Sequence, residues 1–248
     1  MRYRKFFFFI LSLFFLIMNG KMMTFAMNTG FSTEILSEDM KNRILENISI
    51  AVLYEEPAKN TIECFDVSDD GMIALGFSDS ETKMIGVYTP DGVFQYGYKF
   101  NTNGKFGVEW DGNNIIIYFV RSDLAVSVNP TGDVDDILVI QNTIENNNYW
   151  NHSVFSKKRI VGDVEYTIKN DMGFFNIFAS SYSQLVVTDI DVDGGTNIVY
   201  DVNSSHFVRV ISIFIGDLIV VGIVIFLIAR QVIQQKRNTK SICAKHVV

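Results

Sequence analysis

The stretch FDVSDDGMIALGF, residues 65–77, returns about 40 residues later as FGVEWDGNNIIIYF, residues 106–119. Each copy has apolar residues at alternate positions, an Asp-Gly pair, and then a second apolar run. Asp-Gly between two such runs is typical of a tight hairpin, because glycine adopts the positive φ that the turn requires. A second turn, TPDG at residues 89–92, recurs as NPTG at residues 129–132. The sequence therefore predicts a repeated unit of antiparallel strands.

A third and poorer copy follows a longer spacer. Residues 166–171 (YTIKND) open it, and DVDG at residues 191–194 supplies its second turn. The spacer, Gln141 to Asp163, is rich in asparagine and is predicted to be a long loop, a kind of segment that often carries function in a compact domain. A period near 40 residues with four strands per unit is typical of β-propeller blades.

The quoted turns and strands resemble the blades of NHL-like and related bacterial propellers, over roughly residues 60 to 202. The resemblance implies four-stranded units but no particular ligand, because its motifs are mainly turn chemistry. Three units are fewer than the four to eight of ordinary closed propellers, so other segments must cover the open edges. We expect the strand Ile48–Glu55 to pair with the outer edge of one unit, and a second chain or a partner to cover the rest.

Before the first unit, Thr33–Glu46 places apolar residues three and four apart and predicts one short amphipathic helix, capped by Thr33 or Ser37. The expected fold is mainly β, with about three four-stranded, propeller-like blade repeats in an incomplete or open propeller. The short N-terminal helix precedes these repeats, and one transmembrane helix follows them.

That transmembrane helix is predicted from the segment ISIFIGDLIVVGIVIFLIA, residues 211–229. Its helical length is about 28 Å, close to the thickness of the hydrocarbon core of a bilayer. We place the transmembrane helix at residues 207–230. Lys and Arg follow it, and basic residues beside a span tend to remain in the cytoplasm, so residues 231–248 are expected to form a basic cytoplasmic tail.

The N-terminus agrees with this topology. Three basic residues precede the apolar run Phe6–Met18, and Ala26 ends a small-residue cleavage motif. Residues 1–26 are therefore expected to be a signal peptide or, alternatively, an uncleaved signal anchor. Both alternatives leave residues 27–206 outside as an extracytoplasmic β-rich domain. With cleavage, the chain is a single-pass protein of the cell membrane, and a composition low in Pro and rich in Asn, Ile and Phe suggests a bacterial envelope.

Charge is distributed unevenly along the chain. Residues 27–206 carry 27 acidic and 11 basic residues, a net charge of −16, although the whole chain carries only −7. A field of that sign repels phosphate backbones and argues against nucleic acid as a partner. It suits cations, cationic peptides or a basic protein, or it serves only to keep an exported domain soluble.

Cysteine content predicts a fold without disulfides. Cys64 and Cys243 lie on opposite sides of the predicted membrane span and therefore cannot pair with each other. Cys64 stands in an alternating apolar run, so we expect a buried structural thiol.

No catalytic motif emerges, and no cofactor is expected. The few histidines are too scattered for a triad or a histidine metal site. Calcium is the one open alternative, because a D-x-D-x-D-G run and a following amide surround a glycine turn with oxygen ligands. Against it, Tyr200 stands where an EF-hand needs glutamate. The candidate calcium ligands are Asp189, Asp191, Asp193 and Asn197.

Two places are candidates for recognition. Tyr149, Trp150 and His152 lie in the Asn-rich spacer, where exposed aromatic rings often anchor a ligand. The alternative, which the sequence favours for Trp150, is that its ring folds back onto the sheet. Asp217 lies inside the predicted span, where a carboxylate is costly. Ser212 and Gly216 form a small-xxx-small step beside it that lets another helix approach. Asp217 is expected either to pair with a group on a partner membrane protein or in a homodimer, or to reach water at the interface.

The sequence thus favours a non-enzymatic binding or interaction module of the cell envelope, tethered to the lipid bilayer, with an unidentified ligand. The alternative is an envelope enzyme, or an accessory subunit of a membrane complex, that uses turn carboxylates as acid and base. Its candidate residues are Asp69, Asp70 and Asp111. A closed groove lined by carboxylates would favour the enzyme, and a flat sheet with exposed aromatic rings would favour binding.

Overall fold

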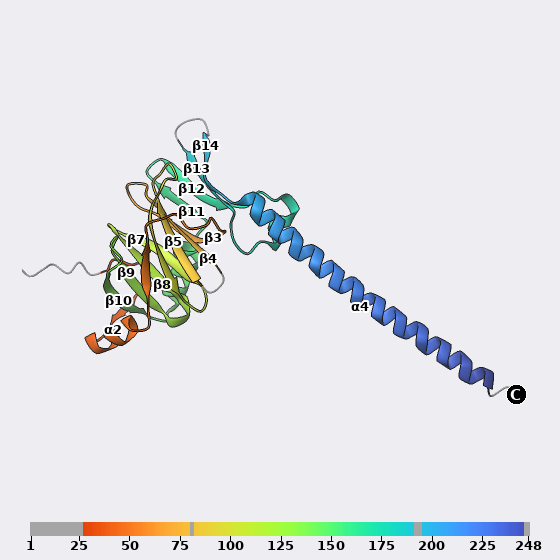
Figure 1. Cartoon of the computed structure of the whole chain (residues 1–248). Coiled ribbons are helices and arrows are strands. Elements are labelled where there is room, and N and C mark those ends of the chain that lie inside the picture. Colours follow the sequence, from red (N-terminus) through yellow and green to blue (C-terminus); the bar gives the residue numbers. More distant parts are fainter. Residues whose placement is uncertain (1–26, 80–81, 191–194, 246–248) are drawn as a thin grey trace, which may run out of the picture.

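The computed structural model describes residues 27–79, 82–190 and 195–245, and gives side chains as far as Gln231 and for Ile233. The predicted signal segment, residues 1–26, lies outside the described residues. In the described part, 14 strands form three antiparallel sheets, and one long C-terminal helix leaves them (Figure 1). The predicted mainly β fold with one apolar C-terminal helix is therefore confirmed, whereas no closed ring of blades is found.

The central sheet has the order β2-β6-β5-β4-β3. Its sequential strands pair as a meander, since alternating Val, Ile and aromatic residues are separated by tight glycine turns. Gly71 and Gly92 in two of these turns have φ of +84° and +82°, as the sequence predicted for hairpin corners. The strands are β2 (Ile50–Leu53), β3 (Ile62–Val67), β4 (Ile73–Asp79), β5 (Thr82–Tyr88) and β6 (Phe94–Asn101).

The second sheet repeats this plan, with the order β1-β10-β9-β8-β7. Its turns again use glycine at positive φ, Gly112 at +60° and Gly132 at +89°. A 3₁₀ turn, η1 (Val120–Ser122), links its middle strands. The strands are β1 (Thr33–Ile35), β7 (Phe106–Asp111), β8 (Asn114–Phe119), β9 (Leu124–Val128) and β10 (Val134–Ile140).

The third sheet, order β11-β12-β13-β14, begins earlier than the sequence suggested. Its first strand is β11 (Lys158–Val161), so Tyr166 belongs to the second strand, β12 (Val164–Lys169), and does not open the unit. The short run KRIV was hidden in the Asn-rich spacer because it carries two basic residues. Strands β13 (Gln184–Asp189) and β14 (Thr196–Asp201) complete the sheet.

Much of the remaining spacer is helical, although the sequence predicted a loop there. Helix α3 (Ile144–Tyr149) continues into a π-helical turn, η2 (Trp150–Val154). Thr143 caps α3, because its side chain accepts a hydrogen bond from the backbone N–H of Asn146. Asn146 itself is buried and bonds Ser32 and Gln141, which ties the spacer to the N-terminal segment.

Two short strands cover sheet edges that a three-unit fold leaves open. Strand β2 pairs with β6 and lies within Ile48–Glu55, where the sequence predicted an edge-covering strand. Strand β1 pairs in the same way with β10. Thr33–Ile35 is therefore extended, and the predicted helix is confined to α2 (Glu38–Leu45). Ser37 stands at its N-cap position without a side-chain cap bond.

The core lies between the sheets. One buried cluster joins the central sheet to the second sheet, and another joins its opposite face to the third sheet. The central sheet is thus buried on both faces, which agrees with its nearly continuous apolar strands. The outer face of the second sheet is covered by Met27 and Phe31 of the N-terminal segment and by the α3–η2 segment. Cys64 is 1% exposed, which confirms the buried thiol that the sequence predicted.

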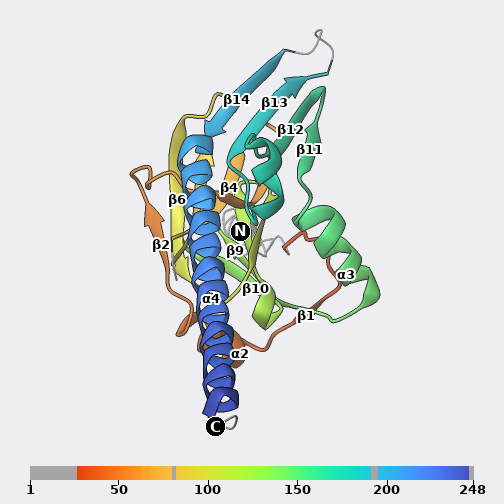
Figure 2. The same ribbon diagram turned by 90° about the vertical axis from the view of Figure 1, so that its right-hand side faces the viewer.

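Helix α4 (Asn203–Lys245) follows β14 and runs away from the sheets (Figures 1 and 2). Within it, Asn203–Gln231 is long and apolar enough to cross a membrane, and none of its most apolar window is buried inside the described structure. The helix also begins a few residues before the predicted span. Near its start it contacts the 3₁₀ segment η3 (Gly173–Phe178).

Candidate functional site

Three strands, one from each sheet, meet around Asp66: β3, β7 and β11. Its Oδ2 accepts a hydrogen bond from the backbone N–H of Trp110 in β7, at 2.8 Å. Its Oδ1 accepts one from Nε of Arg159 in β11, at 2.7 Å. The Asp66 and Arg159 side chains are only 13% and 16% exposed, and the guanidinium lies 5.2 Å from the centroid of the Phe65 ring. The largely buried Asp66 carboxylate therefore joins all three sheets, through its ion pair with Arg159 and its hydrogen bond from Trp110.

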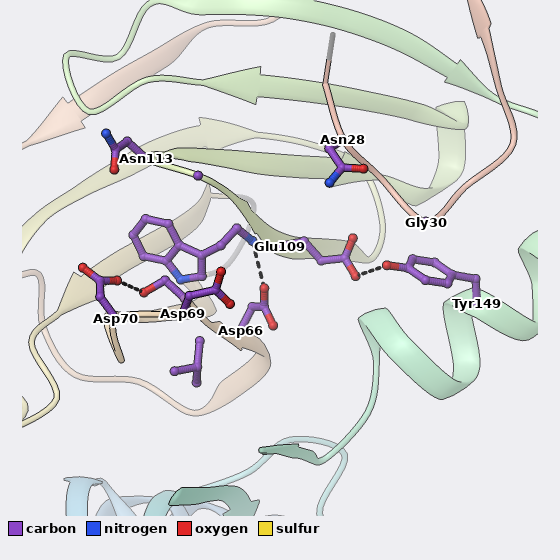
Figure 3. A pocket seen from close by; sticks show the side chains of 12 residues that line it. Asn28, Gly30, Asp66, Asp69, Asp70, Glu109, Asn113 and Tyr149 are labelled. Carbon is purple, nitrogen blue, oxygen red and sulfur yellow. Dashed lines mark hydrogen bonds between the residues drawn. The ribbon is translucent and has the colours of Figure 1, made fainter. Parts of the chain in front are cut away.

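A pocket of about 540 Å³ lies beside this ion pair. Its walls come from the end of β3 and the turn after it, the end of β7 and its turn, the N-terminal segment, and α3. Figure 3 shows the carboxylates of Asp70, Asp69 and Asp66 following one another along the pocket, with Glu109 and Tyr149 beyond them. No lysine or arginine of the described chain lines it. The lining residues are Asn28, Gly30, Asp66, Val67, Ser68, Asp69, Asp70, Glu109, Trp110, Gly112, Asn113 and Tyr149.

The turn after β3 presents its two aspartates differently. The Ser68 hydroxyl donates to Oδ1 of Asp70, and the backbone N–H of Met72 donates to Ser68 Oγ at 2.9 Å. These bonds close the turn around Gly71. Asp69 makes no hydrogen bond to the described part of the chain and is exposed, so its carboxylate is free to meet a ligand.

Glu109 closes the other end of the pocket. Its two carboxylate oxygens accept hydrogen bonds from two tyrosine hydroxyls, Tyr118 at 2.5 Å and Tyr149 at 2.8 Å. Burial raises the pKa of Glu109, and the two hydroxyl donors oppose that rise. The tyrosine pKa values are raised too, first by burial and then by the negative charge of Glu109.

A close approach of the backbone makes room for this arrangement. The N-terminal segment passes the Tyr149 ring at Gly30, where a Cβ atom would overlap Cε2 of the ring. Only glycine therefore lets Tyr149 reach Glu109 past the segment. Asp111 holds the same segment in place, since its Oδ2 accepts the backbone N–H of Asn28 at 3.0 Å.

The three spacer residues predicted to bind a ligand occupy different environments. Tyr149 lines the acidic pocket, and His152 is exposed and lines a neighbouring depression of about 450 Å³. Trp150 packs back onto the second sheet, with its ring centroid 4.5 Å from Phe31 and 5.4 Å from Tyr118. The structure thus has the inward arrangement of Trp150 that the sequence left open as the alternative to an exposed ring.

The carboxylates named for the enzyme alternative are separated by the fold. Asp69 and Asp70 line the pocket, whereas Asp111 does not and instead holds Asn28. The sequence did not predict Asp66 and Glu109 as site residues, because both lie within strands that were identified from their alternating apolar residues. The available signal was a charged residue at an inner position of the first strand of a repeat unit.

One polar atom at the site remains unpaired. Nε1 of Trp110, which lines the pocket, is buried and has no hydrogen-bond partner among the described residues. An indole N–H only donates hydrogen bonds, so its partner would have to be an acceptor such as an oxygen atom.

The described residues do not form the predicted calcium site. Asp191 and Asp193 lie outside the described residues, while Asp189 ends β13 and Asn197 lies in β14. Within the described ranges, no group of three or more His, Cys, Asp or Glu side chains is arranged to hold a metal.

The intramembrane candidates lie on α4. Ser212 donates its hydroxyl to the carbonyl oxygen of Val208, one turn earlier, at 2.8 Å. At about 100° per residue, Ser212 and Gly216 share one face of the helix and Asp217 lies on another, roughly 120° away. A partner helix packed on the small-residue step would therefore meet Asp217 only at its flank.

Comparison of the chain with protein-family models, with curated proteins and with solved structures finds no match. The site is consequently interpreted from its own geometry.

Proposed function

We propose that the protein is a membrane-anchored, extracytoplasmic binding module of the cell envelope, and that its acidic pocket takes a cationic group of a peptide or protein. The observation that carries the proposal is the pocket beside Asp66. Four carboxylates line it, only one of them is neutralised by an arginine, and the surrounding domain has a net charge of −16.

The chemistry of the lining favours an amine or guanidinium. Asp69 is free of hydrogen bonds to the described chain, and Asp70 is exposed beside it. A cation between them would replace like-charge repulsion with two charge-assisted hydrogen bonds. The pocket volume of about 540 Å³ is in the range of sites for small ligands.

The arrangement of sheets supports a propeller-like interpretation. Each sheet is built on a four-stranded meander whose first strand approaches the Asp66 centre, and two added strands cover outer edges. Inner strands of propeller blades surround a common axis, where ligands commonly bind. We include this open, three-unit, NHL-like arrangement in the proposal, with the acidic pocket at its axis.

The test uses the full chain in nonionic detergent, titrated with a trilysine peptide by calorimetry. Replacing Asp69 and Asp70 together with asparagine removes about 1 kcal/mol of attraction per carboxylate, so binding should weaken at least about tenfold. Asp123→Asn is the matched control, because Asp123 is an exposed aspartate between β8 and β9, at the opposite end of the second sheet from the β7–β8 turn that lines the pocket. Absence of trilysine binding by the unchanged protein, or equal weakening by Asp123→Asn, would contradict the proposal.

The enzyme alternative keeps one specific observation. Carboxylates line the pocket, as expected for the enzyme alternative, and burial raises the pKa of Glu109, as in a general acid. Binding is nevertheless favoured, because both oxygens of Glu109 already accept tyrosine hydroxyls and Asp66 is held by Arg159 and Trp110. Neither carboxyl is left free to exchange a proton with a substrate.

The membrane helix supports a second contact as part of the same proposal. Ser212 and Gly216 give α4 a narrow face on which another span can pack, with Asp217 at its flank. We expect a partner membrane protein or a second copy at this face. Asp217→Leu should weaken crosslinking of α4 to that partner, while Leu218→Ile, on the side of the helix away from Ser212 and Gly216, should not. Unchanged crosslinking in Asp217→Leu would remove Asp217 from the interface.

A further inference from the structure

The third sheet carries an insertion that the other two lack. Its middle strands, β12 and β13, are joined by residues 170–183, which include η3. The corresponding connection in the second sheet is only residues 120–123, and in the central sheet only residues 80–81 separate β4 from β5. The inserted sequence NDMGFFNIFASSYS contains three phenylalanines and an isoleucine in five positions. The insertion lies on the sheet from which α4 departs.

Asparagine side chains satisfy the backbone of this insertion. Asn170 accepts from the backbone N–H of Ser183 and donates to the carbonyl oxygen of Ser181. Asn176 accepts from the backbone N–H of Met172 at 2.9 Å. Asn203, the first residue of α4, donates to the carbonyl oxygen of Asp171 at 2.7 Å. These four backbone groups are thus bonded within the protein, and the loop is fastened to the start of the helix.

The apolar side chains of the insertion face outward. Phe174 and Ile177 are each 70% exposed and Phe178 is 48% exposed, although single phenylalanines are usually buried. Phe175 contacts Phe207 and Phe214 of α4, with ring centroids 5.7 Å and 5.9 Å apart. The insertion thus lies against the first turns of the apolar helix in both ribbon views (Figures 1 and 2).

The contacts with α4 set the depth of the insertion. Phe207 and Phe214 are seven residues apart, or about 10 Å along the helix. Phe214 lies inside the apolar run, beyond Arg209, and contacts Phe178 of η3. The 3₁₀ segment η3 therefore extends along α4 from its polar first turn to the beginning of its apolar segment. That depth corresponds to the boundary between headgroups and acyl chains, where aromatic side chains are favoured.

We propose that η3 is a membrane-interface anchor, whose Phe174, Ile177 and Phe178 insert into the outer leaflet beside α4 and hold the β domain close to the bilayer. The inference rests on the proposed membrane anchoring by α4. A second attachment point would fix the tilt of the domain, which a single helix leaves free to rotate.

The experiment uses the full chain reconstituted in phosphatidylcholine vesicles. Cys243→Ser leaves buried Cys64 as the native thiol, so that Phe174→Cys or Ile177→Cys can be labelled with an environment-sensitive fluorophore. Ile160→Cys is the matched control, because Ile160 is 57% exposed on the same sheet, in β11. Leu218→Cys reports on the span itself, because Leu218 is 56% exposed and points away from the Ser212–Gly216 face.

The expected result is a blue-shifted emission at positions 174 and 177, quenched by lipids that carry a nitroxide near the headgroup and insensitive to aqueous iodide. Position 160 should show the opposite behaviour, and position 218 should be quenched by a nitroxide near the acyl end. Iodide quenching at 174 equal to that at 160, with 218 still in lipid, would overturn the anchor while membrane spanning stands. Loss of the lipid signal at 218 would instead refute the spanning helix. Protection from both quenchers at 174 would mean that a protein covers η3, which also overturns the proposal.

Discussion

Removal of the Asp66 carboxylate should destabilise the domain strongly, because one side chain joins three sheets. Asp66→Ala leaves the Arg159 guanidinium, whose side chain is 16% exposed, without its anion, and deprives the backbone N–H of Trp110 of its acceptor. Breaking a buried ion pair by removing one partner costs about 3–5 kcal/mol, and the residual exposure lowers this to about 2–4 kcal/mol. The lost backbone bond adds about 1 kcal/mol. We therefore expect a loss of about 3–5 kcal/mol.

The assay is urea unfolding of the full chain in detergent, followed by tryptophan fluorescence. Asp66→Asn should lose less than Asp66→Ala, because the amide oxygen still accepts from Trp110. Arg159→Met combined with Asp66→Ala should lose less than the sum of the single changes, with a coupling energy of about 1–3 kcal/mol. Glu165→Ala is the control, because its pair with Lys158, at 2.6 Å, is more exposed than the Asp66–Arg159 pair and should contribute little to stability. A loss in Asp66→Ala no larger than that of Glu165→Ala would refute the central role of the ion pair.

Three further predictions concern single residues. Burial raises the pKa of Glu109 in the folded state, so the protonated carboxyl stabilises the fold below the unfolded pKa. This stabilisation is lost as pH rises through the folded pKa. Glu109→Gln should therefore flatten this part of the dependence of unfolding free energy on pH, measured by urea unfolding at several pH values. Gly76→Ala should destabilise by about 1–3 kcal/mol in the same assay, because its Cβ would lie 2.8 Å from Cε2 of Phe106, while Gly195→Ala, which meets nothing within 4 Å, should be neutral. Burial raises the pKa of the Cys64 thiol, so in Cys243→Ser protein a maleimide should label it only above the unfolding concentration of urea, and labelling of the folded chain would contradict this.

Local pattern predicted the elements whose cause is local. The Asp-Gly and Pro-x-Gly turns required positive φ, and the structure has it at Gly71, Gly92, Gly112 and Gly132. The strands of the first two units followed from alternation between these turns. The third unit was misplaced because β11 is short and carries Lys158 and Arg159 where an apolar strand was expected. Its pairing with β12 and the Arg159–Asp66 contact, both non-local, decide that it is a strand.

The candidate site could be predicted only in part for the same reason. Asp69 and Asp70 were visible as turn residues, and Tyr149 as an aromatic residue outside the periodic pattern. Their meeting depends on Asp66 and Glu109 in two strands, on the N-terminal segment, and on α3, which are distant in the sequence. Asparagine content suggested a loop at residues 141–163, whereas Thr143 and buried Asn146 support helix α3 in part of that segment.

The sequence by itself determined the antiparallel repeat and an apolar C-terminal helix long enough to span a membrane, because turn chemistry and hydrophobic length are properties of neighbouring residues. Only the tertiary structure decided which carboxylates share a pocket, which rings are buried, and that the phenylalanines of η3 lie against Phe207 and Phe214. Those contacts join residues far apart in the chain, and their free energy depends on desolvation and packing that exist only once the sheets have assembled.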